Sequence, residues 1–162
     1  MTATKGYMVA LAVFVADQLS KWWIIAGLEL QLKGSIPLLP VLSFTWVENR
    51  GVSMGLLQAD GALERWLLTG VTAAIALGVG WWMRRESNRA DLFALSLVLG
   101  GALGNIVDRV RFGYVVDFVH IHVGGWSFYV FNVADAAITI GVAILLLRAL
   151  FERRPQEQEK EV

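Results

Sequence analysis

The chain has 162 residues, and 56% of them are hydrophobic even without counting glycine, whereas ordinary soluble domains reach about 45–50% with glycine included. Its 14 basic and 14 acidic residues cancel, so nothing in the charge indicates binding to nucleic acid. There is no cysteine, which excludes disulfide bonds, thiolate nucleophiles and cysteine-based metal sites. The high apolar content favours a membrane protein.

Four apolar stretches are long enough to cross a bilayer, which takes about 20 residues. The predicted spans are residues 6–25, 66–83, 92–110 and 132–151. The first could pass for a secretory signal, but Asp17 and Lys21 lie where a cleavage site would need small residues. We therefore expect an uncleaved first span and an all-α membrane protein with four transmembrane helices.

Basic residues near the span ends predict the orientation. The two terminal segments and the short connection between the second and third spans carry eight Lys and Arg residues, against six in the much longer connections on the other side. Because basic residues concentrate on the inner side of a membrane, we expect both termini to lie in the cytoplasm.

The region between the first two spans, residues 26–65, has a different pattern. Apolar and polar residues alternate over 28–33 and again over 42–47, which is typical of half-buried strands. We expect a small β-rich region outside the membrane after the first helix. Residues 1–154 then form a single integral membrane domain with an outer loop at 111–131, and the polar segment 155–162 is expected to be a disordered cytoplasmic tail.

Ionisable and amide side chains in or beside the spans are the informative residues, because a charged group at the bilayer centre costs about 2.5–3.5 kcal/mol. Asp17 and Lys21 are four residues apart, which predicts a structural ion pair on one helix face. Asp108 follows Gly100 and Gly104, whose spacing predicts a close helix contact. Asp108 either pairs with a neighbouring arginine at the end of its span or belongs to a polar site.

Asp117 and Asp135 are expected at the same depth, near the outer ends of their segments. Two carboxyl groups within hydrogen-bond reach cannot both ionise easily, so one keeps a proton and the pair can hold a water molecule. This chemistry hydrolyses peptides without a metal or a covalent intermediate. A proton relay or an ion site in a transporter would use the same residue types.

Two other patterns suggest different chemistry. Gly51, Ser53 and Gly55 match G-x-S-x-G, but the nucleophile elbow needs an α/β sheet that this chain cannot supply. His120 and His122 could bind a metal, although their spacing is not the helical H-E-x-x-H spacing, and surface histidines are the favoured interpretation.

Five short motifs between Asp17 and Gly141 resemble those of bacterial lipoprotein signal peptidases, also called signal peptidase II. Their order along the chain matches the family, and together they are far more specific than any one of them. The motifs are Asp17-Gln18-Leu19-Ser20-Lys21, Asn49-Arg50-Gly51 through Gly55, Gly100 through Asn105 with Asp108-Arg109, Val115-Val116-Asp117-Phe118, and Phe131-Asn132-Val133-Ala134-Asp135.

The resemblance implies an intramembrane aspartic endopeptidase of the bacterial cytoplasmic (inner) membrane, with its active site at the periplasmic interface. It would remove signal peptides from prolipoproteins by cleaving N-terminal to a diacylglyceryl-modified cysteine. Asp117 and Asp135 match the catalytic pair, and Asp17 matches a residue that supports the fold. Residues matching those that position the substrate, the inhibitor or the carboxylates are Asn49, Gly51, Asn105, Asp108, Arg109, Asn132 and Ala134.

The resemblance also implies a monomer without a cofactor or metal, in contact with membrane lipids and inhibited by globomycin-type cyclic peptides. Two positions depart from the family pattern. Met54 stands where phenylalanine is frequent, which affects the packing of the outer loop, and Tyr129 stands where proline often precedes the last motif, which affects how the chain enters the last span.

Overall fold

The computed structural model describes residues 1–51 and 61–151. The predicted tail at 155–162 lies outside the described residues, and so do Ser53, Met54 and Gly55.

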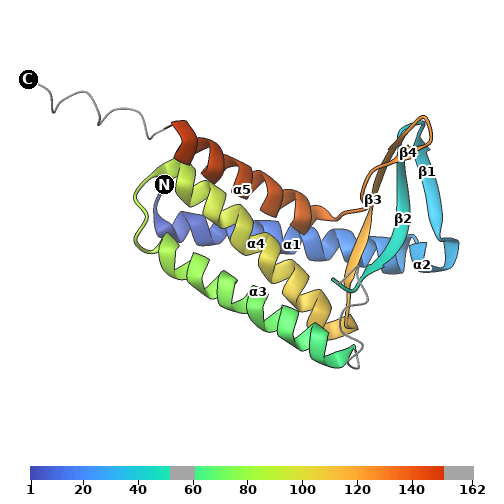
Figure 1. Cartoon of the computed structure of the whole chain (residues 1–162), viewed down its shortest axis with the longest axis horizontal. Coiled ribbons are helices and arrows are strands. Elements are labelled where there is room, and N and C mark those ends of the chain that lie inside the picture. The colour runs from blue at the N-terminus through green and yellow to red at the C-terminus, as the bar shows by residue number, and fades with distance from the viewer. Residues whose placement is uncertain (52–60, 152–162) are drawn as a thin grey trace, which may run out of the picture.

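Four long helices lie side by side in a bundle, with a small sheet across one end (Figure 1). All four are long and apolar enough to cross a membrane, which confirms the predicted spans and fold class. The start of the first helix and the end of the last helix lie together at the end of the bundle opposite the sheet (Figure 1). The helices are α1 (Ala3–Trp22), which continues through the π-helical turn η1 (Trp23–Gly27), α3 (Ala62–Met83), α4 (Arg89–Phe112) and α5 (Val133–Phe151).

Helix α4 occupies the centre of the bundle and packs against α1, α3 and α5. Glycines allow this close approach: a Cβ atom at Gly100 would lie 2.5 Å from the carbonyl oxygen of Ala10 in α1, and one at Gly101 would lie 2.5 Å from that of Ala134 in α5. A Cβ atom at Gly104 would collide with a carboxylate of α1. The small-residue face predicted from the sequence is therefore a close contact between helices.

The sheet has four antiparallel strands in chain order. A register shift between Phe44 and Val47 interrupts the pairing of the two central strands, and such bulges increase twist and re-aim side chains. Ile24, Leu30, Val116 and Phe118 form the buried apolar cluster between the sheet and the end of the first helix. The strands are β1 (Ser35–Leu39), β2 (Leu42–Asn49), β3 (Val115–Val123) and β4 (Trp126–Ser127).

The strand expected near Leu28–Leu32 is wrong, because this segment contains the short helix α2 (Leu30–Lys33). In a strand, Leu30 and Leu32 would share one face, but Leu30 is fully buried and Leu32 is 83% exposed. The backbone reaches this turn through Glu29, which has a positive φ of 50°.

The interpretation of residues 111–131 as a loop is also wrong, since β3 and β4 lie there. The sheet outside the membrane therefore takes half of its strands from each outer region. The second outer region matters for the site, because its strand β3 carries Asp117.

Candidate active site

Asp117 lies on β3, completely buried beneath the sheet. Its Oδ2 accepts a hydrogen bond of 2.9 Å from Asn49 Nδ2 at the end of β2, and its Oδ1 accepts one of 2.6 Å from Asn132 Nδ2 just before α5. The pKa of Asp117 is raised to about 6, mainly by burial and also by the charge of Asp135, and the hydrogen bond from Asn49 opposes this increase. The carboxyl group therefore holds a proton far more readily than an exposed aspartate does.

Asp135 lies in the first turn of α5. Its main-chain N donates to Asn132 Oδ1 at 2.9 Å, so Asn132 caps the helix. Its Oδ1 accepts a hydrogen bond of 2.8 Å from Asn105 Nδ2 in α4. The other oxygen, Oδ2, is buried and has no hydrogen-bond partner within residues 1–51 and 61–151, which leaves one carboxylate oxygen free to accept a proton.

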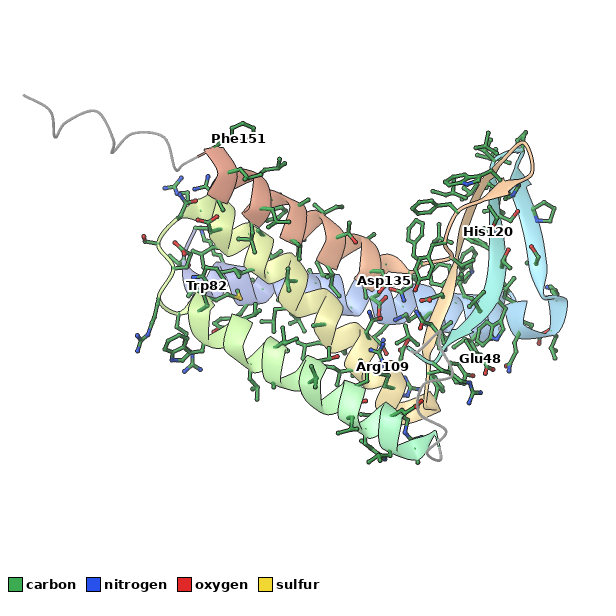
Figure 2. All side chains as sticks on the ribbon, in the orientation of Figure 1. Glu48, Trp82, Arg109, His120, Asp135 and Phe151 are labelled. Carbon is green, nitrogen blue, oxygen red and sulfur yellow. The ribbon has the colours of Figure 1, made fainter. Side chains whose placement is uncertain are left out.

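Two asparagines connect the acids. Asn132 Nδ2 lies 2.6 Å from Asp117 Oδ1 and 3.4 Å from Asn105 Oδ1, and Asn105 in turn donates to Asp135. Asp135 and Arg109 both lie at the end of the bundle next to the sheet, whereas Trp82 and Phe151 mark the opposite end (Figure 2). The two acids expected at one depth are therefore linked through two asparagines that contact each other at the sheet end of the bundle.

A buried ion cluster lies behind these amides. Lys21 Nζ is 2.9 Å from Asp17 Oδ2 and 2.7 Å from Asp108 Oδ2, and all three side chains are almost fully buried. The ion pair expected between Asp17 and Lys21 is thus present. Asp108 pairs with Lys21 and not with a neighbouring arginine, so the alternative of a simple headgroup contact is wrong.

The ion cluster also holds the elements that carry the acids. Asp108 Oδ2 accepts a hydrogen bond of 3.1 Å from the main-chain N of Val116, next to Asp117. Asp17 Oδ1 accepts one of 3.0 Å from the main-chain N of Ala134, next to Asp135. Lys21 Nζ also donates to Asn105 Oδ1 at 3.3 Å, which directs the amide nitrogen of Asn105 toward Asp135.

Arg109 and Gly51 lie at the edge of the site. Arg109 Nη1 donates to the carbonyl oxygen of Asn105 at 3.5 Å, and its positive charge attracts Asp135 and Asp117. Gly51 has a φ of 85° and donates its N–H to Asn49 Oδ1 at 2.9 Å. A side chain at this position would be strained by the backbone and would collide with Leu68.

Two cavities are lined by residues of this arrangement. One, of about 390 Å³, contains Asp135 among apolar groups of α5 and the preceding segment. The other, of about 280 Å³, contains Asp117 and the end of β2. Tyr129 lines both cavities, a role that its sequence position, a departure from the family motif, does not predict.

The two histidines lie on the sheet. His122 Nε2 is 2.8 Å from Ser43 Oγ, and His120 Nδ1 is 3.1 Å from Thr45 Oγ1. His120 lies on the sheet, away from the bundle, whereas Asp135 lies at the end of the bundle (Figure 2). Among the described residues there is no group of three His, Cys, Asp or Glu side chains that could hold a metal ion.

Known proteins are similar to this chain in sequence and in fold. The family model described as signal peptidase (SPase) II matches residues 9–151. A lipoprotein signal peptidase of Rhizorhabdus wittichii is 54% identical over 152 residues, covering 93% of this chain and 88% of the relative. One of Sphingopyxis alaskensis is 49% identical over 146 residues, covering 90% and 84%.

A bacterial membrane enzyme solved by the in meso method at 2.3 Å resolution has a similar structure, with a TM-score of 0.78, 31% identity, and coverage of 98% of this chain and 94% of the other. A second such structure, at 1.9 Å, has a TM-score of 0.78 and 30% identity, with coverage of 91% and 93%. The chain belongs to the signal peptidase II family and is therefore a peptidase and a multi-pass bacterial membrane protein.

Proposed function

We propose that this chain removes signal peptides from prolipoproteins as an aspartic endopeptidase, cleaving N-terminal to the diacylglyceryl-modified cysteine. The relatives named lipoprotein signal peptidase support the class of substrate. The observation that carries the mechanism is the hydrogen-bonded chain that links the two acids: Asn132 donates to Asp117 and to Asn105, and Asn105 donates to Asp135.

In this mechanism the two acids have different starting states. Asp117, whose pKa is raised to about 6 by burial, carries the proton. Asp135 is ionised, and its unpartnered Oδ2 accepts a proton from the attacking water. The water oxygen bonds to the carbonyl carbon of the scissile peptide while Asp117 donates its proton to the carbonyl oxygen.

The tetrahedral intermediate then breaks down with the roles exchanged. Asp135 gives its proton to the amide nitrogen as the C–N bond breaks, and Asp117 takes a proton from one hydroxyl of the intermediate. The products are a free carboxyl group on the signal peptide and a free amine on the lipid-modified cysteine, and both acids return to their starting states. A site shielded from bulk water strengthens each of these interactions.

The surrounding polar residues have positioning roles in this proposal. Asn49, Asn105 and Asn132 orient the carboxyl groups through the hydrogen bonds described above. Arg109 presents its guanidinium to the developing negative charge, and Gly51 supplies the positive φ of 85° that the turn after Asn49 requires. The main-chain contacts at Val116 and Ala134 keep Asp117 and Asp135 in place through Asp108 and Asp17.

We further propose that residues 1–154 act as a single membrane domain and as a monomer. The termini are cytoplasmic and the site lies at the periplasmic interface, in contact with membrane lipids. This depth suits a substrate whose lipid-modified cysteine stays in the bilayer while its scissile bond reaches the headgroups. A globomycin-type peptide would compete with the substrate for the two carboxyl groups.

The test is to replace each acid by its amide in the purified, lipid-reconstituted protein and to measure cleavage of a diacylglyceryl-modified prolipoprotein. Asp117→Asn and Asp135→Asn should each lower kcat by about 10²–10⁴-fold, because each removes a proton donor or acceptor. Mass spectrometry of the product identifies the bond that is cleaved. Asp91→Asn is the matched control, since Asp91 is paired with Arg148 at the opposite end of α4; cleavage near the wild-type rate by either dyad variant contradicts the mechanism.

A further inference from the structure

Tyr129 occupies the junction of the two cavities that contain the acids. It lies between β4 and α5, and its side chain is 62% exposed. The larger cavity is mainly apolar and contains Asp135, with Phe131 and Ile140 among its walls. The smaller cavity contains Asp117. A peptide chain that enters both cavities would therefore contact the Tyr129 side chain.

The hydroxyl group of Tyr129 has a defined role in the hydrogen bonding. Asn49 Nδ2 donates one hydrogen to Asp117 Oδ2 at 2.9 Å and the other to Tyr129 Oη at 2.7 Å. Asn49 Oδ1 accepts from the N–H of Gly51 at 2.9 Å. Asn49 thus uses all of its hydrogen-bonding groups, and the tyrosine oxygen acts as an acceptor.

The O–H hydrogen of Tyr129 remains available. Within the part of the chain that the structure describes, the only hydrogen bond of this hydroxyl is the one it accepts from Asn49. Burial raises the pKa of Tyr129 above its ordinary value of 10, and the charges of Asp117 and Asp135 raise it further. The group is therefore a neutral donor at physiological pH, on an exposed side chain that lines both cavities.

We propose that Tyr129 positions the substrate: its O–H donates to a main-chain carbonyl of the peptide next to the cleaved bond, and its ring separates the side chains that enter the two cavities. The inference rests on the proposed function and deepens it. Tyr129 does not exchange protons with the reacting atoms, so its contribution falls on substrate binding and selectivity.

The first test removes only the hydroxyl group. Tyr129→Phe keeps the ring and should raise KM by about 2–12-fold, the range that corresponds to one neutral hydrogen bond, while kcat stays within about twofold. Tyr114→Phe is the matched control, because Tyr114 lines neither cavity. A purely structural role would instead lower the fraction of active enzyme, and so kcat, without raising KM.

The second test removes the ring. Tyr129→Ala joins the two cavities, so it should accept a bulkier side chain next to the cleaved bond. With two lipid-modified substrates that carry alanine or leucine before the cysteine, the ratio of kcat/KM should shift toward leucine by about tenfold, as expected when a wall of an apolar pocket is removed. Tyr129→Phe should leave this ratio unchanged, because its ring remains.

An unchanged KM in Tyr129→Phe, or an unchanged selectivity in Tyr129→Ala, overturns the inference. A fall in kcat at constant KM in Tyr129→Phe also overturns it, since that result would place Tyr129 in the chemical step through Asn49. The dyad variants are measured on the same substrate. If they are inactive and the Tyr129 results fail, only the role of Tyr129 is wrong; if they remain active, the proposed mechanism fails independently of Tyr129.

Discussion

Asp117 should make the folded protein less stable as the pH rises, and the size of the effect follows from its surroundings. The carboxyl group is fully buried, and its pKa is raised from the ordinary 3.8 to about 6. At 1.36 kcal/mol for each tenfold change in proton affinity, this difference corresponds to ~3 kcal/mol between the folded and unfolded chains. Replacing Asp117 by Asn removes the titration.

The sign of the effect is set by where the proton binds more tightly. The folded chain holds the Asp117 proton up to about pH 6, whereas the unfolded chain releases it near the ordinary value of 3.8. The stability of the wild type relative to Asp117→Asn should therefore be greatest below the lower pKa, fall by up to ~3 kcal/mol as the pH rises between the two values, and stay constant above them. The altered hydrogen bonds to Asn49 and Asn132 add an offset that does not depend on pH.

The assay compares unfolding of the two proteins in the same detergent from about pH 4 to about pH 8. The difference between them reports the titration of Asp117 together with its electrostatic coupling to Asp135, because the remaining titrating groups are common to both. Asp91→Asn, measured in parallel, reports the effect of removing a partly exposed, ion-paired aspartate. A difference that is flat over this range, or that favours the wild type more strongly at higher pH, would refute the reasoning.

Three further results are expected. Lys21→Met should destabilise the protein by about 3–5 kcal/mol, because it leaves the buried carboxylates of Asp17 and Asp108 without their cation; chemical unfolding measures it. Gly101→Val should destabilise by about 1–3 kcal/mol and lower kcat, since a Cβ atom there meets the carbonyl oxygen of Ala134, next to the catalytic end of α5. Removal of metal ions with a chelator should leave cleavage within about twofold of the untreated rate, because the proposed chemistry uses only carboxyl groups and water.

Matched substitutions separate these effects from general damage. Lys33→Met removes an exposed lysine of α2 and should change stability little. Gly70→Val introduces the same side chain at a position in α3 where a Cβ atom meets nothing within 4 Å. Equal losses in a test variant and its control would contradict the contacts assigned to Lys21 or Gly101, and loss of activity with the chelator would favour a metal-dependent mechanism.

The transmembrane helices could be predicted because the bilayer fixes their length and composition. Each of the four predicted spans falls on a helix, with ends that differ by a few residues. Only the helix centres are determined by hydrocarbon, and polar contacts outside it decide the ends. Asn132, for example, lies just before α5 because it caps that helix with its side chain.

The small outer sheet was harder to predict, because the apolar pattern of a short segment can fit either a strand or a helix. The alternating leucines of residues 28–33 have the period of a strand, yet Leu28 and Leu30 pack in the apolar cluster while Leu32 is exposed, and the segment turns as α2. Conversely, Val119, Ile121 and Val123 alternate with the two histidines, which is the period of the strand β3. Tertiary packing decided both cases.

The acids of the site could be named from the sequence, but their supports could not. Asp117 and Asp135 belong to recognisable motifs, whereas the partner of Asp108 depends on how α1 packs against α4. The role inferred for Tyr129 depends on two cavities that exist only after the sheet folds over the bundle. The local sequence gives residue type and spacing, but it does not show which groups distant in the chain come into contact.

The two asparagines that fasten the acids have one more consequence. An amide neither gains nor loses a proton over the pH range in which carboxyl groups titrate. Asn105 and Asn132 can therefore donate the same hydrogen bonds to Asp135 and Asp117 whichever acid is charged. In the proposed mechanism, protons can therefore move between the acids and the substrate without a change in these two hydrogen bonds.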